Sequence, residues 1–168
     1  MGEKLKRSVS ELFLQDKPSK ILIYLKKENK PLYTAIISRE VDATYAHTLN
    51  VLAELKKLKF VSFKESGRIK LVNLTELGSE AAGILISFID LLELGDIERE
   101  MDQTYEKEIK GKLREEMNKE AISKQFDKLK AKLNRYIEEK PTNVSILARK
   151  LLKKADDVLA EAFGCPPG

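Results

Sequence analysis

The chain has 168 residues, of which 42% are hydrophobic and 35% are charged, with a net charge of +4 and a pI of about 9.0. This length suits one ordinary domain, or a small domain with an extension. The charged share exceeds the ~25% of typical globular chains, so part of the chain must expose much surface, as long solvated helices do. The single cysteine, Cys165, excludes an internal disulfide and a multi-cysteine metal site within one chain.

Membrane and secretion signals are not recognisable in the sequence. The segment MGEKLKRSVS is charged, and no apolar core of a signal peptide follows it. The stretch AAGILISFIDLLEL is broken by Asp90 and is too short to span a bilayer. The sequence therefore predicts a cytoplasmic protein with no membrane partner.

Helical signals dominate the first third of the chain. Residues 1–17 are polar apart from the cluster ELFL and are expected to form an N-terminal arm. Pro18 can occupy the first turn of a helix that ends near KENKP, and Thr34 is a plausible N-cap for a short second helix. After the turn DAT, TYAHTLNVLAELKK predicts a third helix on the same core. Its regularly spaced leucines are Leu49, Leu52 and Leu55.

The segment FVSFKESGRIKLVNL changes to an alternation of apolar and polar residues. This pattern predicts two strands joined by a hairpin, with Gly67 at the tip because glycine tolerates a positive φ. Thr75 and Glu76 follow as an N-cap and a first-turn acid. They open a helix at about 76–94 that is apolar on too many sides for solvent, so it should be buried within the chain or against a second chain.

The composition changes after Gly95. From 96 to 140 there is no proline and one glycine, Gly111, and Lys and Glu fill most of the positions between apolar residues. Apolar residues spaced 4-3-4-3, as in a coiled-coil seam, are Ile122, Phe126, Leu129, Leu133 and Tyr136. The region is therefore one long exposed helix with a narrow apolar stripe, or two helices broken near Gly111. Pro141 ends this region, and Thr142 or Asn143 can cap a last helix that stops near Gly164.

This order of helix, short helix, turn, helix, ribbon and helix resembles the winged helix-turn-helix domain of MarR-like and ArsR-like regulators and their archaeal relatives. The segments that carry the resemblance are ISREVDATYAHTLNVLAELKKLKFVSF, SGR and LTELG. In that family a Leu-Thr-x-x-Gly run closes the wing and opens the next helix. One position departs from the family pattern, because Lys59 stands where a glycine usually precedes the apolar pair that opens the wing.

The resemblance implies a mainly α fold with a small β-hairpin, in which a winged helix-turn-helix domain is followed by long helices that form a coiled coil or a helical hairpin. The expected domains are an N-terminal arm (1–17), a DNA-binding domain (18–94), a helical dimerisation region (95–164) and a flexible tail (165–168).

The resemblance also implies a recognition helix at about 45–57 in the major groove and a wing at about 60–74 on the backbone or the minor groove. Asn50 can pair bidentately with adenine, and Arg68 at the wing tip can enter a minor groove or bind phosphate. The candidate DNA-binding residues are Thr44, Tyr45, His47, Asn50, Lys56, Lys57, Lys64, Arg68 and Lys70.

Charge is concentrated in the same segment. Between Lys56 and Lys70 there are six basic residues and one acid, a net +5, which leaves −1 for the rest of the chain. Neutralising about four to six phosphates would make log K fall with log[salt] at a slope of roughly −4 to −5. Plainer interpretations also exist, because a lysine run can be a solubility face and Asn50, His47 or Tyr45 can be ordinary surface or rim residues.

Enzyme chemistry has little support, because the sequence has no glycine-rich phosphate loop and no Cys/His cluster, and its carboxylates alternate with lysines. No cofactor is predicted. The expected function is a dimeric DNA-binding transcriptional regulator, with double-stranded DNA and a second copy of the chain as partners.

Two alternatives stay open. The winged helix can be a protein-interaction module in a larger assembly, or the chain can be an architectural chromatin protein with low sequence specificity. Residues 96–168 hold 16 basic and 15 acidic residues, which favours dimerisation or effector binding there over DNA binding. The operator, the direction of regulation, any effector and whether the C-terminal helices pair within or between chains are not determined by the sequence.

Overall fold

The computed structural model describes residues 15–66 and 69–164. The chain divides into two compact units between Ile86 and Ser87, inside one helix. The N-terminal arm, Arg68 at the wing tip and Cys165 in the tail lie outside the described residues. The elements are α2 (Asp16–Glu28), β1 (Leu32–Tyr33), α3 (Thr34–Glu40), α4 (Tyr45–Lys57), β2 (Val61–Ser66), β3 (Ile69–Leu74), α5 (Glu76–Glu108), α6 (Lys119–Glu139) and α7 (Thr142–Phe163).

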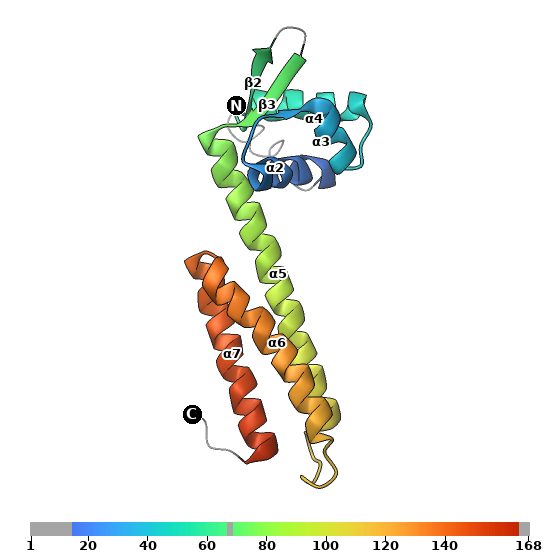
Figure 1. Cartoon of the computed structure of the whole chain (residues 1–168), viewed down its shortest axis with the longest axis vertical. Helices are drawn as coiled ribbons and strands as arrows, with labels where there is room; N and C mark the ends of the chain where they lie inside the picture. The colour runs from blue at the N-terminus through green and yellow to red at the C-terminus, as the bar shows by residue number, and fades with distance from the viewer. Residues whose placement is uncertain (1–14, 67–68, 165–168) are drawn as a thin grey trace, which may run out of the picture. The chain divides into compact units, whose positions relative to one another are not determined.

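The first unit is a winged helix-turn-helix, as the sequence predicts. Helices α2, α3 and α4 pack together with an antiparallel sheet of strand order β1-β3-β2 (Figure 1). The hairpin register pairs Val61 with Leu74 and Phe63 with Val72. The third strand, β1, was not predicted, because two residues are too few to show an alternation.

The first unit encloses a single apolar core. The buried side chains from its helices and strands are Ile21, Leu22, Leu25, Leu32, Ile37, Val41, Val51, Leu52, Leu55, Val61, Val72 and Ala82. The expected place of Leu49 in this core is wrong, since its side chain is 38% exposed. Thr48, which is fully buried, takes the core-facing position one residue earlier, because the buried stripe of α4 continues to Val51, Leu52 and Leu55.

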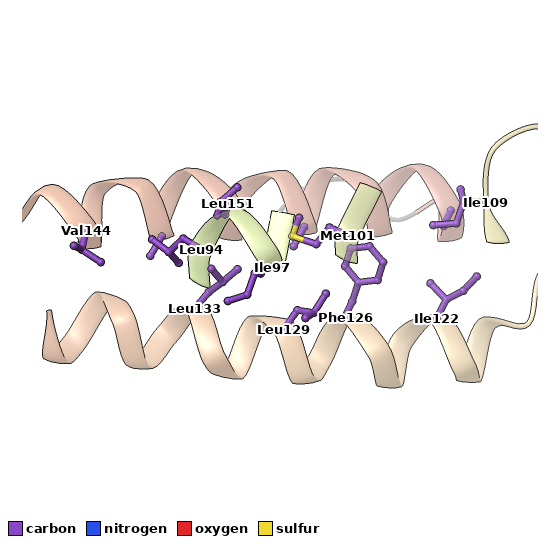
Figure 2. Close-up of a cluster of buried hydrophobic side chains, with 13 residues drawn as sticks. Leu94, Ile97, Met101, Ile109, Ile122, Phe126, Leu129, Leu133, Val144 and Leu151 are labelled. Carbon is purple, nitrogen blue, oxygen red and sulfur yellow. The ribbon is translucent and has the colours of Figure 1, made fainter. Parts of the chain in front are cut away.

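The second unit is a bundle built from the later part of α5 and the antiparallel hairpin of α6 and α7 (Figure 1). Figure 2 shows Phe126 of α6 beside Met101 of α5, and Leu129 and Leu133 of α6 pointing into the space between α6 and α7, where Ile97 of α5 and Leu151 of α7 also lie. The predicted 4-3-4-3 seam of α6 is therefore buried, and α6 and α7 pair within one chain. The expected helical hairpin is confirmed.

Three boundaries differ from the sequence-based predictions. The apolar helix does not stop at Gly95 but continues to Glu108, since Gly95 lacks the positive φ with which a glycine ends a helix. The break comes near Gly111, whose φ is +72°, which confirms the two-helix alternative. Thr34 and Thr142 are first helical residues, so the N-caps are Tyr33 and Pro141.

No helix among the described residues has the length and apolar character needed to cross a bilayer. The boundary expected between the DNA-binding domain and the helical region at residue 94 stays a prediction.

Candidate nucleic-acid interface

The turn between α3 and α4 is fixed by the backbone. Asp42 adopts a positive φ of 50° after the end of α3. Its N–H donates to the Arg39 carbonyl at 3.2 Å, and the Ala43 N–H donates to the Ser38 carbonyl at 3.0 Å, as in a Schellman motif. Lys17 of α2 adds a tie that sequence reasoning missed, because its Nζ donates to the carbonyls of Val41 and Asp42 at 2.8 Å each. The direction in which α4 leaves the turn is therefore determined by several bonds.

Thr44 is the N-cap of α4. Its Oγ1 accepts a hydrogen bond from the His47 N–H at 3.2 Å, while the Thr48 hydroxyl donates to the Thr44 carbonyl at 3.0 Å. The first of these bonds satisfies the His47 N–H, which would otherwise lack a partner in the first turn. The Thr44 carbonyl also accepts from the Thr48 N–H at 2.9 Å. Thr44 was predicted as a DNA contact; the structure gives it a capping role, and its contact with DNA stays a prediction.

The outward face of α4 is a row of three short side chains followed by a lysine. Ala46, Asn50, Ala53 and Lys57 follow the spacing i, i+4, i+7 and i+11, and all four are exposed. The buried stripe on the other side of the helix contains Thr48, Val51, Leu52 and Leu55. The flanks of the row are also exposed and comprise Tyr45, Leu49 and His47. The predicted reading residues Tyr45, His47 and Asn50 are therefore all accessible to a partner.

The lysines predicted to bind phosphate differ in whether their ammonium groups already contact another side chain. Lys57 Nζ lies 2.6 Å from Glu54 Oε1 in an i,i+3 ion pair, and Lys56 Nζ sits 5.2 Å from the centre of the Phe63 ring. Lys64 on β2 is exposed, with no ion pair to any described residue. Lys70 lies on β3, and Arg68 falls outside the described residues. The cationic contribution of α4 itself is therefore partly neutralised within the chain.

The backbone at the base of the wing shows why a glycine is usual at the position of Lys59. The Lys59 N–H donates to the Lys56 carbonyl and the Phe60 N–H donates to the Leu55 carbonyl, both at 2.9 Å. This is the Schellman ending of a helix, in which the residue after the C-cap takes a left-handed conformation that glycine adopts without strain. Lys59 has a φ of +62°, so it adopts the glycine conformation at a cost in backbone energy.

Thr75 joins the end of α4 to the start of α5 within the first unit. Its hydroxyl donates to the Lys59 carbonyl at 2.6 Å and accepts from the Gly78 N–H at 3.0 Å, while its own N–H donates to the Phe60 carbonyl at 3.1 Å. A side chain on Gly78 would overlap the Phe60 carbonyl. The Leu-Thr-x-x-Gly run thus has a physical reason: threonine ties the wing to the helix, and glycine admits the wing backbone.

Helix α5 carries an uncovered apolar stripe. Leu77 and Ile84 lie seven residues apart on one face of α5 in the first unit, and Phe88 and Leu92 lie four residues apart on one face of it in the second unit. Their exposed fractions lie between 53% and 70%. The sequence predicted that this helix is buried within the chain or against a second chain, and this stripe is not buried within the described part of one chain.

The second unit contains a buried carboxylate. Asp90 of α5 is 7% exposed, and its Oδ1 lies 2.9 Å from Lys140 Nζ. Its Oδ2 is buried and has no hydrogen-bond partner among the described residues. Nearby, the Tyr136 hydroxyl donates to Glu93, and burial together with this carboxylate raises the pKa of the tyrosine. Within 15–66 and 69–164, no group of three or more metal-ligating side chains is placed to hold a metal ion.

No family model and no curated protein matches the chain. Among solved structures, AF1382 from Archaeoglobus fulgidus is similar to this chain, with 24% identity and a TM-score of 0.46. The alignment covers 49% of this chain and 94% of AF1382. The adhesin competence repressor AdcR from Streptococcus pyogenes covers 61% of this chain and 81% of its own, with 18% identity and a TM-score of 0.45. ZitR from Lactococcus lactis covers 56% and 74%, with 18% identity and a TM-score of 0.43. These identities and TM-scores are too low to assign a function to this chain.

Proposed function

We propose that this protein is a DNA-binding transcriptional regulator that acts as a dimer, with α4 in the major groove and the wing on the DNA backbone or minor groove. The observation that carries the proposal is the exposed row of α4, which is held between a turn fixed by Lys17 and Asp42 and a wing tied down by Thr75. A helix held in this way can be inserted as a rigid body, and the major groove admits an α-helix.

The distribution of side chains on α4 supports this use. Its first turns expose Tyr45, Ala46, His47 and Asn50, and in helix-turn-helix proteins the first residues of the recognition helix contact base edges. Lys56 at its end and Lys64 on β2 supply positive charge for phosphates, which position the protein without reading sequence. The predicted contacts of Arg68 and Lys70 extend this charge along the wing.

The stripe on α5 supports the dimer. Four exposed large apolar side chains on one helix are more than the scattered apolar residues expected on a solvated surface, and such a cluster is typical of an interface. A second copy brings the identical cluster, so a two-fold interface can bury both. Two recognition helices would then read two half-sites of one duplex.

The test of DNA binding uses a random-sequence duplex at about 50 and 200 mM salt. The wild-type chain is compared with a wing variant, Lys64→Ala, Arg68→Ala and Lys70→Ala, and with a control of equal charge, Lys124→Ala, Lys128→Ala and Lys132→Ala on α6. The control lysines are exposed and form no ion pair with described residues. We expect binding that weakens steeply with salt, is largely lost in the wing variant and is kept in the control.

Two results would contradict the proposal. If the folded protein binds no DNA even at low salt, the winged helix is better explained as a protein-interaction module. If the α6 control loses affinity as much as the wing variant does, DNA contact is not specific to the first unit.

The dimer is tested separately by sedimentation. Phe88→Glu places a charge in the middle of the apolar stripe, and we expect it to convert dimer to monomer because a buried unpaired charge is strongly unfavourable. Gln103→Glu adds the same charge at an exposed polar position of the same helix and should leave the dimer intact. A wild-type chain that sediments as a monomer at all concentrations, or a dimer that is insensitive to Phe88→Glu, would remove the stripe from the interface.

A further inference from the structure

The outward face of α4 has a composition that bears on which bases it can read. From Tyr45 to Leu55 the helix contains no arginine and no lysine. Bidentate Arg or Lys is the commonest reader of guanine, through its O6 and N7 acceptors. The part of α4 that leads into a groove therefore lacks the usual means of recognising a G·C pair.

Asn50 occupies the centre of this face. It is exposed, and within the described residues its side chain makes no hydrogen bond, so both its amide donor and its carbonyl acceptor are free. An amide side chain matches the N6 donor and N7 acceptor of adenine in the major groove. Asn50 is thus exposed at the centre of this face, and its amide group is available to hydrogen-bond adenine.

The neighbours of Asn50 on the same face are methyl-bearing. Ala46 lies one turn before it, Ala53 one turn after it, and Leu49 is partly exposed beside them. Small apolar side chains contact the C5-methyl group of thymine, which is the only apolar feature of a base edge in the major groove. A face with one amide between two alanines complements adjacent A·T and T·A pairs.

The other polar side chains of α4 do not offset this pattern. Glu54 and Lys57 could read a G·C pair, but they lie in the last turns of the helix and are paired with each other at 2.6 Å. His47 sits on the flank of the row, next to the N-cap, and offers a single donor when neutral. Neither arrangement supplies a bidentate guanine reader at the centre of the helix.

From these observations we infer that α4 reads an A·T-rich half-site through the major groove, with Asn50 bonding adenine and Ala46, Leu49 and Ala53 contacting thymine methyl groups. This inference rests on the proposed DNA-binding function and adds the base composition of the target and the residue that reads it. It concerns the major groove only, so it differs from an A·T preference that arises from a narrow minor groove.

The experiment begins with selection of duplexes from a random library by the wild-type protein, followed by affinity measurements on the selected site. We expect each half-site to be dominated by A·T pairs. Three probes then test the contacts: 7-deazaadenine removes the N7 acceptor, deoxyuridine removes the thymine methyl, and Asn50→Ala removes the amide. At the adenine that faces Asn50, Asn50→Ala should weaken binding roughly 5- to 150-fold, the range for one bidentate pair. 7-Deazaadenine removes one of the two hydrogen bonds of that pair, so it should weaken binding by a smaller factor.

The decisive result is the combination. If Asn50 bonds this adenine, 7-deazaadenine should have little further effect on the Asn50→Ala variant, because the two changes remove the same contact. Asn50→Gln, which keeps an amide, should retain part of the preference for adenine. Affinity for a duplex of G·C pairs should be equal in wild type and Asn50→Ala, which also shows that the variant is folded.

The possible results distinguish a failure of A·T readout from a failure of the proposed DNA-binding function. Selection of a G·C-rich site, or binding without base preference, would overturn A·T readout and leave DNA binding in place; the second result would favour an architectural protein. Additive effects of 7-deazaadenine and Asn50→Ala would overturn the role of Asn50. Failure to bind any DNA would overturn both.

Discussion

The two units of this chain keep their structures by different means. Besides its apolar core, the first unit uses backbone geometry at the ends of short helices. Asn29, Asp42 and Lys59 all adopt positive φ there, and Thr75 and Gly78 join the wing to α5. The second unit depends on long apolar stripes packed between helices, with ion pairs on their margins such as that of Lys154 with Glu98 and Asp102. In the first unit, hydrogen bonds at both ends of α4 fix the direction of this exposed helix. In the second unit, apolar contacts along the helices hold a bundle together.

The two exposed helices differ in charge, and the more basic of them, α6, is not the helix proposed to bind DNA. Helix α6 exposes Lys124, Lys128 and Lys132 in one row, whereas the first turns of α4 expose no lysine or arginine. Compared helix with helix, charge alone would favour α6 over the first turns of α4, although the segment 56–70, which includes the wing, carries a net charge of +5. Base recognition needs side chains with specific donors, acceptors and methyl groups on a rigidly held helix, and α4 provides these.

The largest effect should come from the junction at Gly78. Gly78→Ala forces a methyl group into the Phe60 carbonyl, so we expect a loss of roughly 3 kcal/mol or more in the free energy of unfolding. Amide hydrogen exchange should show lost protection in α4, β2 and β3, while α6 and α7 keep theirs.

A matched control lies in the same helix. At Gly83 an added methyl group meets nothing within 4 Å, so Gly83→Ala should stabilise α5 by about 0.5–1 kcal/mol through helix propensity. If both alanine variants behaved alike in thermal unfolding, the close approach at Gly78 would not be the cause.

A smaller effect, confined to the second unit, should follow from the loss of Lys140. Lys140→Met leaves the buried Asp90 carboxylate without its partner, and we expect a loss of roughly 2–3 kcal/mol, at the low end for a buried pair because Lys140 is partly exposed. The variant Asp90→Leu with Lys140→Met should recover most of this loss in urea unfolding. A double variant as unstable as the single one would show that packing, and not the uncompensated charge, determines the effect.

The smallest effect sharpens the comparison in the first unit. Lys59→Gly supplies the residue that a Schellman ending prefers, so it should stabilise the protein by roughly 0.5–1 kcal/mol. Thermal unfolding is the measurement, with Lys57→Gly as the control at a helical position, where glycine should destabilise by a similar amount. Destabilisation by Lys59→Gly would mean that the lysine side chain contributes more than its backbone strain costs.

The sequence was sufficient for features that leave a repeating pattern. The recognition helix was predicted at 45–57 and α4 has these bounds, and the alternation that begins at Phe60 predicted β2 and β3. The spacing of Ile122, Phe126, Leu129 and Leu133 likewise predicted the buried face of α6. Each of these signals extends over several turns or several residues, so it survives local exceptions.

Features decided by single residues or by tertiary contacts were not predictable in the same way. Gly95 and Gly111 look alike in sequence, yet only the second has a positive φ and ends a helical segment. The hydrogen bond from Lys17 to the Val41 carbonyl joins residues 24 positions apart, and no local sequence pattern predicts it. The residues expected to bind DNA were chosen from a family resemblance. The structure adds that those between Thr44 and Lys64 are exposed, while their role stays a proposal.

The most direct test of the central claim, that DNA contacts the first unit and not the second, is to map amide chemical-shift changes when duplex DNA is added to the full chain. We predict changes concentrated in α4, β2 and β3, with Asn50 and Lys64 among the residues affected and α6 and α7 unchanged. Changes concentrated along Lys124, Lys128 and Lys132 of α6, with α4 unaffected, would contradict the account.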